Sequence, residues 1–588
     1  MIFSKIPLIV GALGILAFGT ITSFAAPKSS KGESEIPLEE VLSHPVFAPM
    51  NNDKIPAAKD KIIGQWTWAD CPKEEVDLPT TEKPWKDKGK ILSLISKIDE
   101  YLQGDPKKTK AFPAAEIFPG VPTGECDLLA RTVELDPTIG GWHSVGLYAP
   151  PGQKIKLSPV GKNRWPVTLR IGCHTDFLTM NHIEKNHNGE LKRAPKMTNT
   201  IRLEAGKKSV ELANPFGGLI YIDVPIQEGK LAKPQKFLIE GGIMSPLYIM
   251  GPKDKKGVEI AITSREEWQR QLQETHAPWG EIATPRLIFT LPNKYLQMMK
   301  IPRRVCKNLQ NGMAMCDWLI GWDVYHPRQI YTPMRFVIDV QISVGWGHSG
   351  YPAMGYMAWG NCIQNGSLVK EGSWGLFHEL GHNHQWAPFR FEGCGEVTVN
   401  LFSIIAQTHG VGVPYERAWD GTDVSGRSMY APVNEFIKSK KTFDEEEDAR
   451  LKLYFFVELM RSLGYESFRN VALRHHKEKP KLSTNQECWD YFFLTLCDVT
   501  DKNLTPYFEL WKIDISQKAK QKAKRYREEW LPCPSYPAKM PAYKEENAAI
   551  AARIQTADDV QKSKRDKAAA EKAEQEKKER RRKMLEAI

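Results

Sequence analysis

The sequence predicts an α+β protein of several domains, in which a β-sandwich-like domain is followed by a mainly helical domain. Between about 140 and 250, short runs of alternating apolar residues are separated by turns rich in Gly, Pro and Asn, which is typical of a sandwich. The clearest runs are 144–149, 167–171 and 218–224. From residue 374 onward, longer apolar patterns with helical spacing dominate, for example from Ala449 to Leu463 and from Cys488 to Leu496.

The first 25 residues are typical of a secretory signal peptide. Lys5 precedes an apolar core from Ile6 to Phe18, and small residues follow around Ala25, where cleavage is expected. The alternative is an uncleaved anchor, although the apolar core is short for a membrane span. No other stretch is long and apolar enough to cross a bilayer, so we expect an exported protein with no stable membrane span after cleavage.

Residues 26–135 predict a linker and a small N-terminal element, because they are rich in Pro and charge and contain one amphipathic stretch, from Ile91 to Tyr101. Residues 136–252 form the predicted sandwich-like domain. Within it, His174 and Asp176 are expected to form a structural hydrogen-bonded pair rather than a second metal site. Residues 253–540 form the second domain, with further strands expected at 286–291 and 336–342.

The formal charge of +10 does not predict a nucleic-acid partner. Lys and Arg are concentrated in residues 541–588, which predict an exposed charged helix or a disordered tail. Ten cysteines remain possible disulfide partners in an exported protein, and Cys306 with Cys316 or Cys488 with Cys497 could staple loops. No Cys-x-x-Cys pair occurs, so a thiolate zinc site is not expected.

The stretch His378-Glu379-Leu380-Gly381-His382 carries the strongest chemical signal. On a helix, His378 and His382 project from one face and can bind one Zn²⁺. Glu379 is then held beside the open coordination position, where a carboxylate can take a proton from water and return it. The alternative is a pair of surface histidines beside an exposed Glu, but the apolar residues before the motif favour a buried helix.

A third metal ligand is expected downstream of the motif. Gln385 and Pro388 stand where a metzincin needs Gly and His, so that class is excluded. A Glu on the following helix is the gluzincin alternative, for which Glu396 is the best candidate and Glu392 the second. A carboxylate at a helix N-terminus is also a common stabilising feature.

Two polar residues near the proposed ligands have expected supporting roles. Asn400 lies one helical turn after Glu396 and could accept a hydrogen bond from the non-metal nitrogen of a ligand histidine. His384 is too close to His382 to share its helix face, so it is expected to be a pocket or structural residue.

Aromatic and basic residues flank the motif and could contact a sugar-bearing substrate, because aromatic faces stack on sugar rings and Arg and His donate to hydroxyls. The alternative is that most of them belong to the core. The predicted substrate contacts are Trp346, His348, Tyr351, Trp386 and Arg390, of which Trp346 and His348 are favoured.

Several blocks of the chain resemble the enhancin-like zinc metallopeptidases, peptidase family M-sixty. The similar blocks are Val145-Gly-Leu-Tyr-Ala-Pro, Arg170-Ile-Gly-Cys-His-Thr-Asp176, Pro215-Phe-Gly-Gly-Leu-Ile-Tyr221, Asp339-Val-Gln-Ile-Ser343, His348-Ser-Gly-Tyr-Pro352, Phe377-His-Glu-Leu-Gly-His-Asn-His-Gln385 and Gly395-Glu-Val-Thr-Val-Asn-Leu-Phe-Ser403. The resemblance spans roughly residues 140–470. It implies a β-sandwich packed beside a gluzincin-type catalytic domain, with a metal set that maps onto His378, His382 and Glu396 and a catalytic Glu379.

The resemblance further implies secreted enzymes that cut mucin-like proteins, often next to an O-linked glycan. We therefore expect a secreted zinc endopeptidase with one Zn²⁺ per chain and an O-glycosylated, mucin-type protein substrate. Two alternatives stay open: a peptidase that does not require a glycan, and a non-catalytic glycoprotein-binding protein on the same fold. A glycosidase would need paired carboxylates flanking a sugar bond, and no such pair can be singled out.

Overall fold

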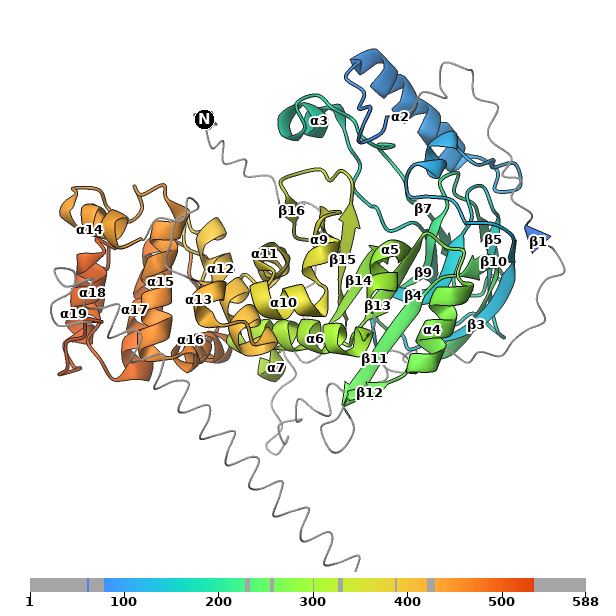
Figure 1. The fold of residues 1–588 in the computed structure, drawn as a ribbon. Coiled ribbons are helices and arrows are strands. Elements are labelled where there is room, and N and C mark those ends of the chain that lie inside the picture. Colours follow the sequence, from blue (N-terminus) through green and yellow to red (C-terminus); the bar gives the residue numbers. More distant parts are fainter. Residues whose placement is uncertain are drawn as a thin grey trace, which may run out of the picture. The chain divides into compact units, whose positions relative to one another are not determined.

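The computed structural model describes residues 61–62, 79–227, 233–253, 259–299, 301–325, 332–386, 389–419 and 429–532. The predicted signal peptide and the charged tail, as well as Cys71 and Cys533, lie outside these residues. Figure 1 shows a part rich in strands followed by a helical part, and within the described chain the last strand ends at Tyr356, so the α+β order expected from the sequence is confirmed at this level.

The first domain is built from eight antiparallel strands. They are β3 (Leu129–Leu135), β4 (Gly141–Ala149), β5 (Ile155–Pro159), β6 (Val167–Ile171), β7 (Asn199–Leu203), β8 (Val210–Leu212), β9 (Gly218–Val224) and β10 (Gln235–Met244). Strand β10 joins two halves: its first part pairs with β3 and β5, and its end pairs with β4 after a bulge at Glu240–Gly242. Apolar side chains from both halves, including Trp165, Leu169 and Phe237, share one core. This arrangement is sandwich-like, and the three runs that the sequence singled out lie in β4, β6 and β9.

Short elements precede the sandwich or are inserted in it. They are β1 (Lys61–Ile62), α2 (Lys88–Gln103), the 3-10 turn η2 (Pro113–Glu116), β2 (Cys126–Asp127) and α3 (Met180–Asn186). Asp87 caps α2 by accepting from the Lys90 amide, and Ile91, Leu94 and Ile98 form its buried face. The amphipathic pattern in this stretch therefore forms a helix, as its spacing predicts.

A second, mixed sheet follows the sandwich. Its strands are β11 (Leu247–Lys253), β12 (Glu259–Ala261), β13 (Trp279–Ala283), β14 (Leu287–Pro292), β15 (Met334–Asp339), β16 (Gly347–His348) and β17 (Ala353–Tyr356), in the order β12-β11-β13-β14-β15-β17-β16. The chain changes sheets between Met244 and Leu247, ahead of the boundary at residue 252 that the sequence predicts. Strand β16 is the last strand at its edge within the described residues, and it lies beside the helix that contains His378 and His382.

Helices surround and follow the second sheet. They are α4 (Arg265–Glu274), α5 (Asn293–Met298), α6 (Pro302–Leu319), α7 (Trp322–Tyr325), α9 (Trp359–Cys362), α10 (Asn365–Glu371), α11 (Trp374–His382), α12 (Gly395–Ile405), the π-helix η4 (Ala406–Val411), α13 (Tyr415–Ala418), α14 (Tyr430–Lys438), α15 (Ala449–Leu463), α16 (Tyr465–Glu478), α17 (Asn485–Thr500), α18 (Thr505–Leu510) and α19 (Gln517–Ala523). The helix expected from Ala449 to Leu463 is confirmed by α15, and the pattern at 488–496 lies inside α17. Within the described chain, no helix combines the length and apolar character of a membrane span.

Buried polar contacts of two arginines join the sandwich domain to the second sheet. Arg335 of β15 donates to Glu281 of β13 at 2.9 Å and to the Ser144 hydroxyl of β4 at 2.9 Å. Arg193, which lies between β6 and β7, donates to Asp339 at the end of β15 at 2.9 Å. Unpaired charges so deeply buried would be costly, and each cation here faces a carboxylate. The sandwich and the second sheet are thus held together by polar contacts as well as by packing.

The disulfides considered from sequence spacing do not form. Cys306 and Cys316 both lie on α6, and Cys488 and Cys497 both lie on α17. Residues nine or ten apart on a helix are separated by about 14–15 Å along its axis, well beyond the reach of a disulfide. All eight described cysteines are free.

Candidate metal centre

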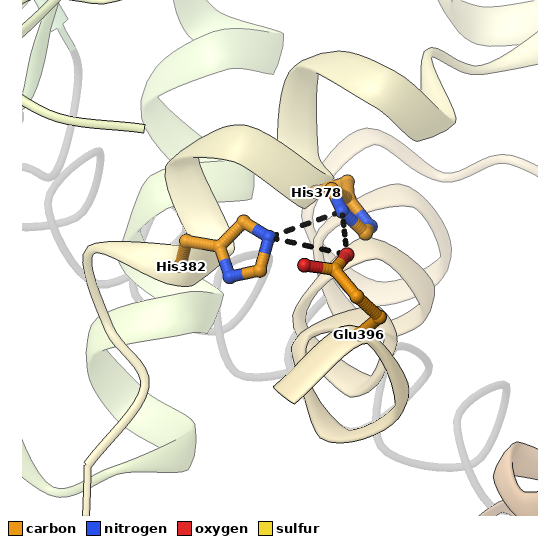
Figure 2. Close-up of side chains that lie close together, drawn as sticks. All are labelled: His378, His382 and Glu396. Atoms are coloured by element: carbon orange, nitrogen blue, oxygen red, sulfur yellow. Dashed lines mark hydrogen bonds and ion pairs between the residues drawn. The ribbon is translucent and has the colours of Figure 1, made fainter. Parts of the chain in front are cut away.

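Helix α11 places the two motif histidines on one face. Its apolar residues Leu376, Phe377 and Leu380 are buried, and Phe377 packs so closely on Gly312 of α6 that a Cβ there would lie 2.5 Å from the ring. The helix is therefore fixed by one face against α6. On another face, the Nε2 atoms of His378 and His382 point toward each other and lie 3.1 Å apart (Figure 2).

Helix α12 brings the third group to the same point. It crosses α11 at Gly381, where a Cβ would lie 2.9 Å from the Phe402 Cβ and 3.1 Å from the Val399 carbonyl oxygen. Glu396, in the first turn of α12, then places its Oε2 atom 3.1 Å from Nε2 of His378 and 3.5 Å from Nε2 of His382 (Figure 2). The lack of a side chain at position 381 is thus what allows the two helices to approach this closely.

Two amides fix the orientation of the histidine rings. Nδ1 of His378 donates to Asn400 Oδ1, and Nδ1 of His382 donates to Gln385 Oε1, both at 2.7 Å. The Asn400 amide nitrogen donates to the Glu396 carbonyl, and that of Gln385 donates to the Gly395 carbonyl. The structure therefore places Asn400 where the sequence predicts it. The contact of Gln385 is not predicted from the sequence, although its spacing of three residues from His382 could indicate it.

The donor set fits a metal ion. With both Nδ1 atoms protonated, each Nε2 carries a lone pair, and two facing lone pairs repel unless an electron-pair acceptor lies between them. In a tetrahedral zinc site, bond lengths of about 2.0–2.2 Å put neighbouring donors about 3.3 Å apart, close to the separations seen here. Within the described residues this is the one group of three or more His, Cys, Asp or Glu donors close enough to share an ion.

The pKa shifts of His378 and Glu396 in the metal-free protein agree with a cation site. Burial opposes protonation of His378, but its bonds to Glu396 and Asn400 outweigh burial and raise its pKa. Hydrogen bonds from His378 and His382 lower the pKa of Glu396 well below its usual range. The site therefore holds a carboxylate against a proton-binding imidazole, and a metal ion can replace that proton.

Glu379 lies beside this group but is not one of its three donors. Its side chain is 9% exposed, and burial raises its pKa although His378 and His382 act in the opposite direction. A Cβ on Gly347 of β16 would lie 2.8 Å from the Glu379 Cγ, so only glycine fits between the edge strand and this carboxylate. A buried carboxylate with a raised pKa next to a metal site is suited to accept and return a proton.

Of the two favoured candidates for substrate contact, Trp346 directly precedes β16 and His348 is the second residue of that strand. Trp346 is 78% exposed, with its ring 5.4 Å from Tyr356. His348 instead has protein partners at both ring nitrogens: Nε2 donates to Asp176 Oδ2, and Nδ1 donates to the Ser349 carbonyl, both at 2.8 Å. Trp346 is thus available to a ligand, whereas His348 serves the architecture of the loop.

The other three predicted contacts are placed differently. The Tyr351 hydroxyl accepts from the Trp142 amide at 3.0 Å, so this residue anchors its loop to the sandwich. Trp386 stacks on His476 with ring centroids 3.9 Å apart, which makes it part of the packing against α16. Arg390 is exposed, in the connection between α11 and α12.

Two other residues considered near the motif, His384 and Glu392, are not part of the group of three donors. His384 is buried and bonds to the Leu380 carbonyl and to Asp317, which agrees with the structural role expected of it. Glu392 is exposed, and its amide bonds to Asn485 at a distance from the three donors.

The expected pairing of His174 with Asp176 is wrong. His174 Nδ1 lies 3.2 Å from Asp339, and Asp176 pairs with His348, so each reaches across to the second domain. Neighbouring positions in the sequence suggest a local pair, whereas the real partners are supplied by strands of the second sheet, more than 150 residues away.

Two family models match consecutive parts of the chain. The model described as the N-terminal domain of M60-like peptidases matches residues 128–235, and the one described as Peptidase M60, enhancin and enhancin-like matches residues 241–512. The chain is also similar to human TRPM8 channel-associated factor 1, with 31% identity over 410 residues. That alignment covers 68% of this chain and 41% of the human protein, so the chain spans about two fifths of the length of that relative.

Solved structures share the fold at low sequence identity. A conserved protein of unknown function from Bacillus anthracis superposes with a TM-score of 0.52 and 19% identity, over 68% of this chain and 80% of that chain. The IMPa metallopeptidase from Pseudomonas aeruginosa, in complex with an O-glycopeptide, superposes with a TM-score of 0.51 and 14% identity, over 72% of this chain and 53% of that chain.

Proposed function

Because the chain belongs to the Peptidase M60, enhancin and enhancin-like family, we propose that it is an exported zinc endopeptidase that cuts O-glycosylated, mucin-type proteins. The observation that carries this proposal is the convergence of His378, His382 and Glu396, with Glu379 alongside. Each residue that the reaction requires is present, and each is held by a partner or by packing.

Three side chains would hold one Zn²⁺, and the other residues of the site support them. Bound there, the ion would acidify a water molecule and polarise the carbonyl of the scissile bond. Glu379 takes the proton of the attacking water and delivers it to the leaving amine, for which its raised pKa is appropriate. Asn400 and Gln385 keep the imidazole rings turned so that Nε2 is the donor.

The proposed substrate class follows from the surroundings of Glu379. Edge strand β16 passes directly beside this carboxylate and can accept an extended peptide as a further strand. Next to it, the exposed indole of Trp346 offers a flat face on which a sugar ring can stack. The O-glycopeptide bound by IMPa supports a glycosylated peptide as the ligand of this fold.

The proposed location is outside the cytoplasm. It rests on the signal-peptide pattern of residues 1–25, which lie outside the described residues. A mucin-type substrate agrees with that location. No nucleic-acid partner is proposed, because Lys and Arg reach their highest density in the C-terminal tail, where they are mixed with Asp and Glu, and none is among the three donors of the metal centre.

The variant Glu379→Gln tests the assigned chemistry. It keeps the size and polarity of the side chain but removes its proton acceptor, so cleavage of a mucin should fall about 10²- to 10⁴-fold. Zinc content should remain that of the unchanged protein, because Glu379 is not one of the three donors. Equal cleavage by the two proteins, at equal zinc content, would refute the role of Glu379.

A second candidate function is glycoprotein binding without catalysis. The similarity to TRPM8 channel-associated factors favours it, because their name describes an association with a channel rather than a peptidase activity. A zinc-loaded protein that binds a mucin but releases no new termini would support this alternative.

The other alternative is a peptidase that does not require a glycan. Enzymatic removal of O-glycans before digestion tests it, since such a peptidase would cut the stripped protein equally well.

A further inference from the structure

The loop between β15 and β17 forms the wall of the site beside Glu379. It contains edge strand β16, and Gly347 of that strand leaves no room for a Cβ against the Glu379 carboxylate. The residue before it, Trp346, is the most exposed large apolar side chain of the described residues. The position of this short segment therefore determines both the space around the proposed base and the aromatic surface that meets a substrate.

A single carboxylate oxygen from the sandwich domain holds both ends of this segment. Oδ2 of Asp176, in the loop after β6, accepts from the Ser343 amide at 2.6 Å and from His348 Nε2 at 2.8 Å. Asn186 of α3 adds a bond to the Ser343 carbonyl at 2.6 Å. The anchoring groups thus belong to the N-terminal domain, while the segment that they hold belongs to the catalytic domain.

The contact between Asp176 and His348 is a charged one. Both ring nitrogens of His348 face oxygen acceptors, so both carry hydrogen and the ring is an imidazolium. The two side chains are only 19% and 11% exposed, so solvent screens their attraction weakly. Burial raises the pKa of Asp176, but the bond to His348 outweighs burial and lowers it to about 2. A charge-assisted bond of this kind is stronger than a neutral one.

We propose that Asp176 and His348 are positioning residues of the peptidase site, through which the N-terminal domain fixes the Ser343–His348 segment and, with it, Trp346 and Gly347. This inference rests on the proposed function, because it concerns how the same site receives its substrate. It gives the N-terminal domain a part in substrate binding, in addition to packing against the catalytic domain.

The variants Asp176→Asn and Asp176→Ala test the proposal in the full chain. Asparagine keeps the shape and one acceptor but removes the charge, whereas alanine removes both, so the effect should be larger for alanine. For a mucin-derived glycopeptide, KM should rise by about tenfold, the effect of losing one charge-assisted bond, while kcat changes less. Zinc content should be unchanged.

A matched control is Ser144→Ala. It removes a different contact between the two domains, the bond from Arg335, without touching the Ser343–His348 segment. Hydrogen–deuterium exchange of peptides that cover residues 343–349 supplies a readout independent of activity. Exchange there should be faster in both Asp176 variants than in the unchanged protein and in Ser144→Ala.

Unchanged exchange in the segment for both Asp176 variants would overturn the proposal, as would an equal rise in KM for Ser144→Ala. Failure of the proposed function and failure of the positioning role give different results. If the unchanged protein cuts no glycoprotein, the proposed function fails, and the exchange comparison still decides whether Asp176 holds the segment. If cleavage is seen but the Asp176 variants keep the original KM, only the positioning role fails.

Discussion

Three histidines within seven residues of the chain, His378, His382 and His384, have two different kinds of surroundings. His378 and His382 have one ring nitrogen bonded to an amide oxygen, and their other nitrogens face each other. His384, two residues further on, is fully buried, and both of its ring nitrogens face oxygen atoms of the protein. The first pair leaves lone pairs for a ligand, whereas the third ring leaves none.

The partners of these histidines differ in the same way. Asn400 and Gln385 are neutral, so they fix the rings without competing for a cation. Asp317, which bonds His384, is charged, and it also receives two bonds of 2.7 Å from Arg286. Burial alone would raise the pKa of Asp317, but Arg286 and His384 outweigh burial and lower it. The comparison separates two histidines whose Nε2 atoms converge with a carboxylate, as metal ligands do, from a third whose ring nitrogens are both used in a buried network.

The largest effect is expected from disrupting the buried network of His384, Asp317 and Arg286, and it should appear as a loss of stability. Asp317→Ala leaves the Arg286 guanidinium buried without its carboxylate, which should lower the free energy of unfolding by about 3–5 kcal/mol. Urea denaturation of the metal-free protein measures this change. His378→Ala is the matched variant, and it should cost much less because the metal group is partly exposed. A loss below about 1 kcal/mol for Asp317→Ala would show that the network is not structural.

A smaller effect is expected at the amides that orient the metal ligands. Gln385→Leu keeps the volume of the side chain but removes the acceptor for His382 Nδ1, so zinc affinity should fall about 10- to 100-fold. Competition with a chelator of known affinity measures the change. Gln407→Leu is a control, because that buried glutamine donates to the Ser403 carbonyl away from the three donors. Equal zinc affinity in Gln385→Leu and the unchanged protein would mean that this amide does not orient the ligand.

The part of the site that the sequence predicts is the part that helix spacing determines. His378 and His382 lie one helical turn apart, as do Glu396 and Asn400, so their relative placement follows from local geometry alone. The sequence also indicated that the two helices would meet, because a third ligand was needed.

The contacts that the sequence did not reveal depend on distant segments. Asp176 and His348 are 172 residues apart, and nothing local indicates that they pair. Most strands of the second sheet were missed for a related reason. Strands β14 and β15 agree with the runs expected at 286–291 and 336–342, but β12, β16 and β17 are only two to four residues long, and β13 is buried at every position, so it lacks the alternation by which a strand is identified.

The most direct test of the account is the zinc content of the purified, zinc-saturated protein, determined by elemental analysis after removal of loosely bound metal. The unchanged chain should retain one Zn²⁺, and Glu396→Ala and His382→Ala should retain far less. A protein that retains no zinc, or a Glu396→Ala variant that retains it as tightly as the unchanged chain, would contradict the assignment of these three side chains as a metal centre.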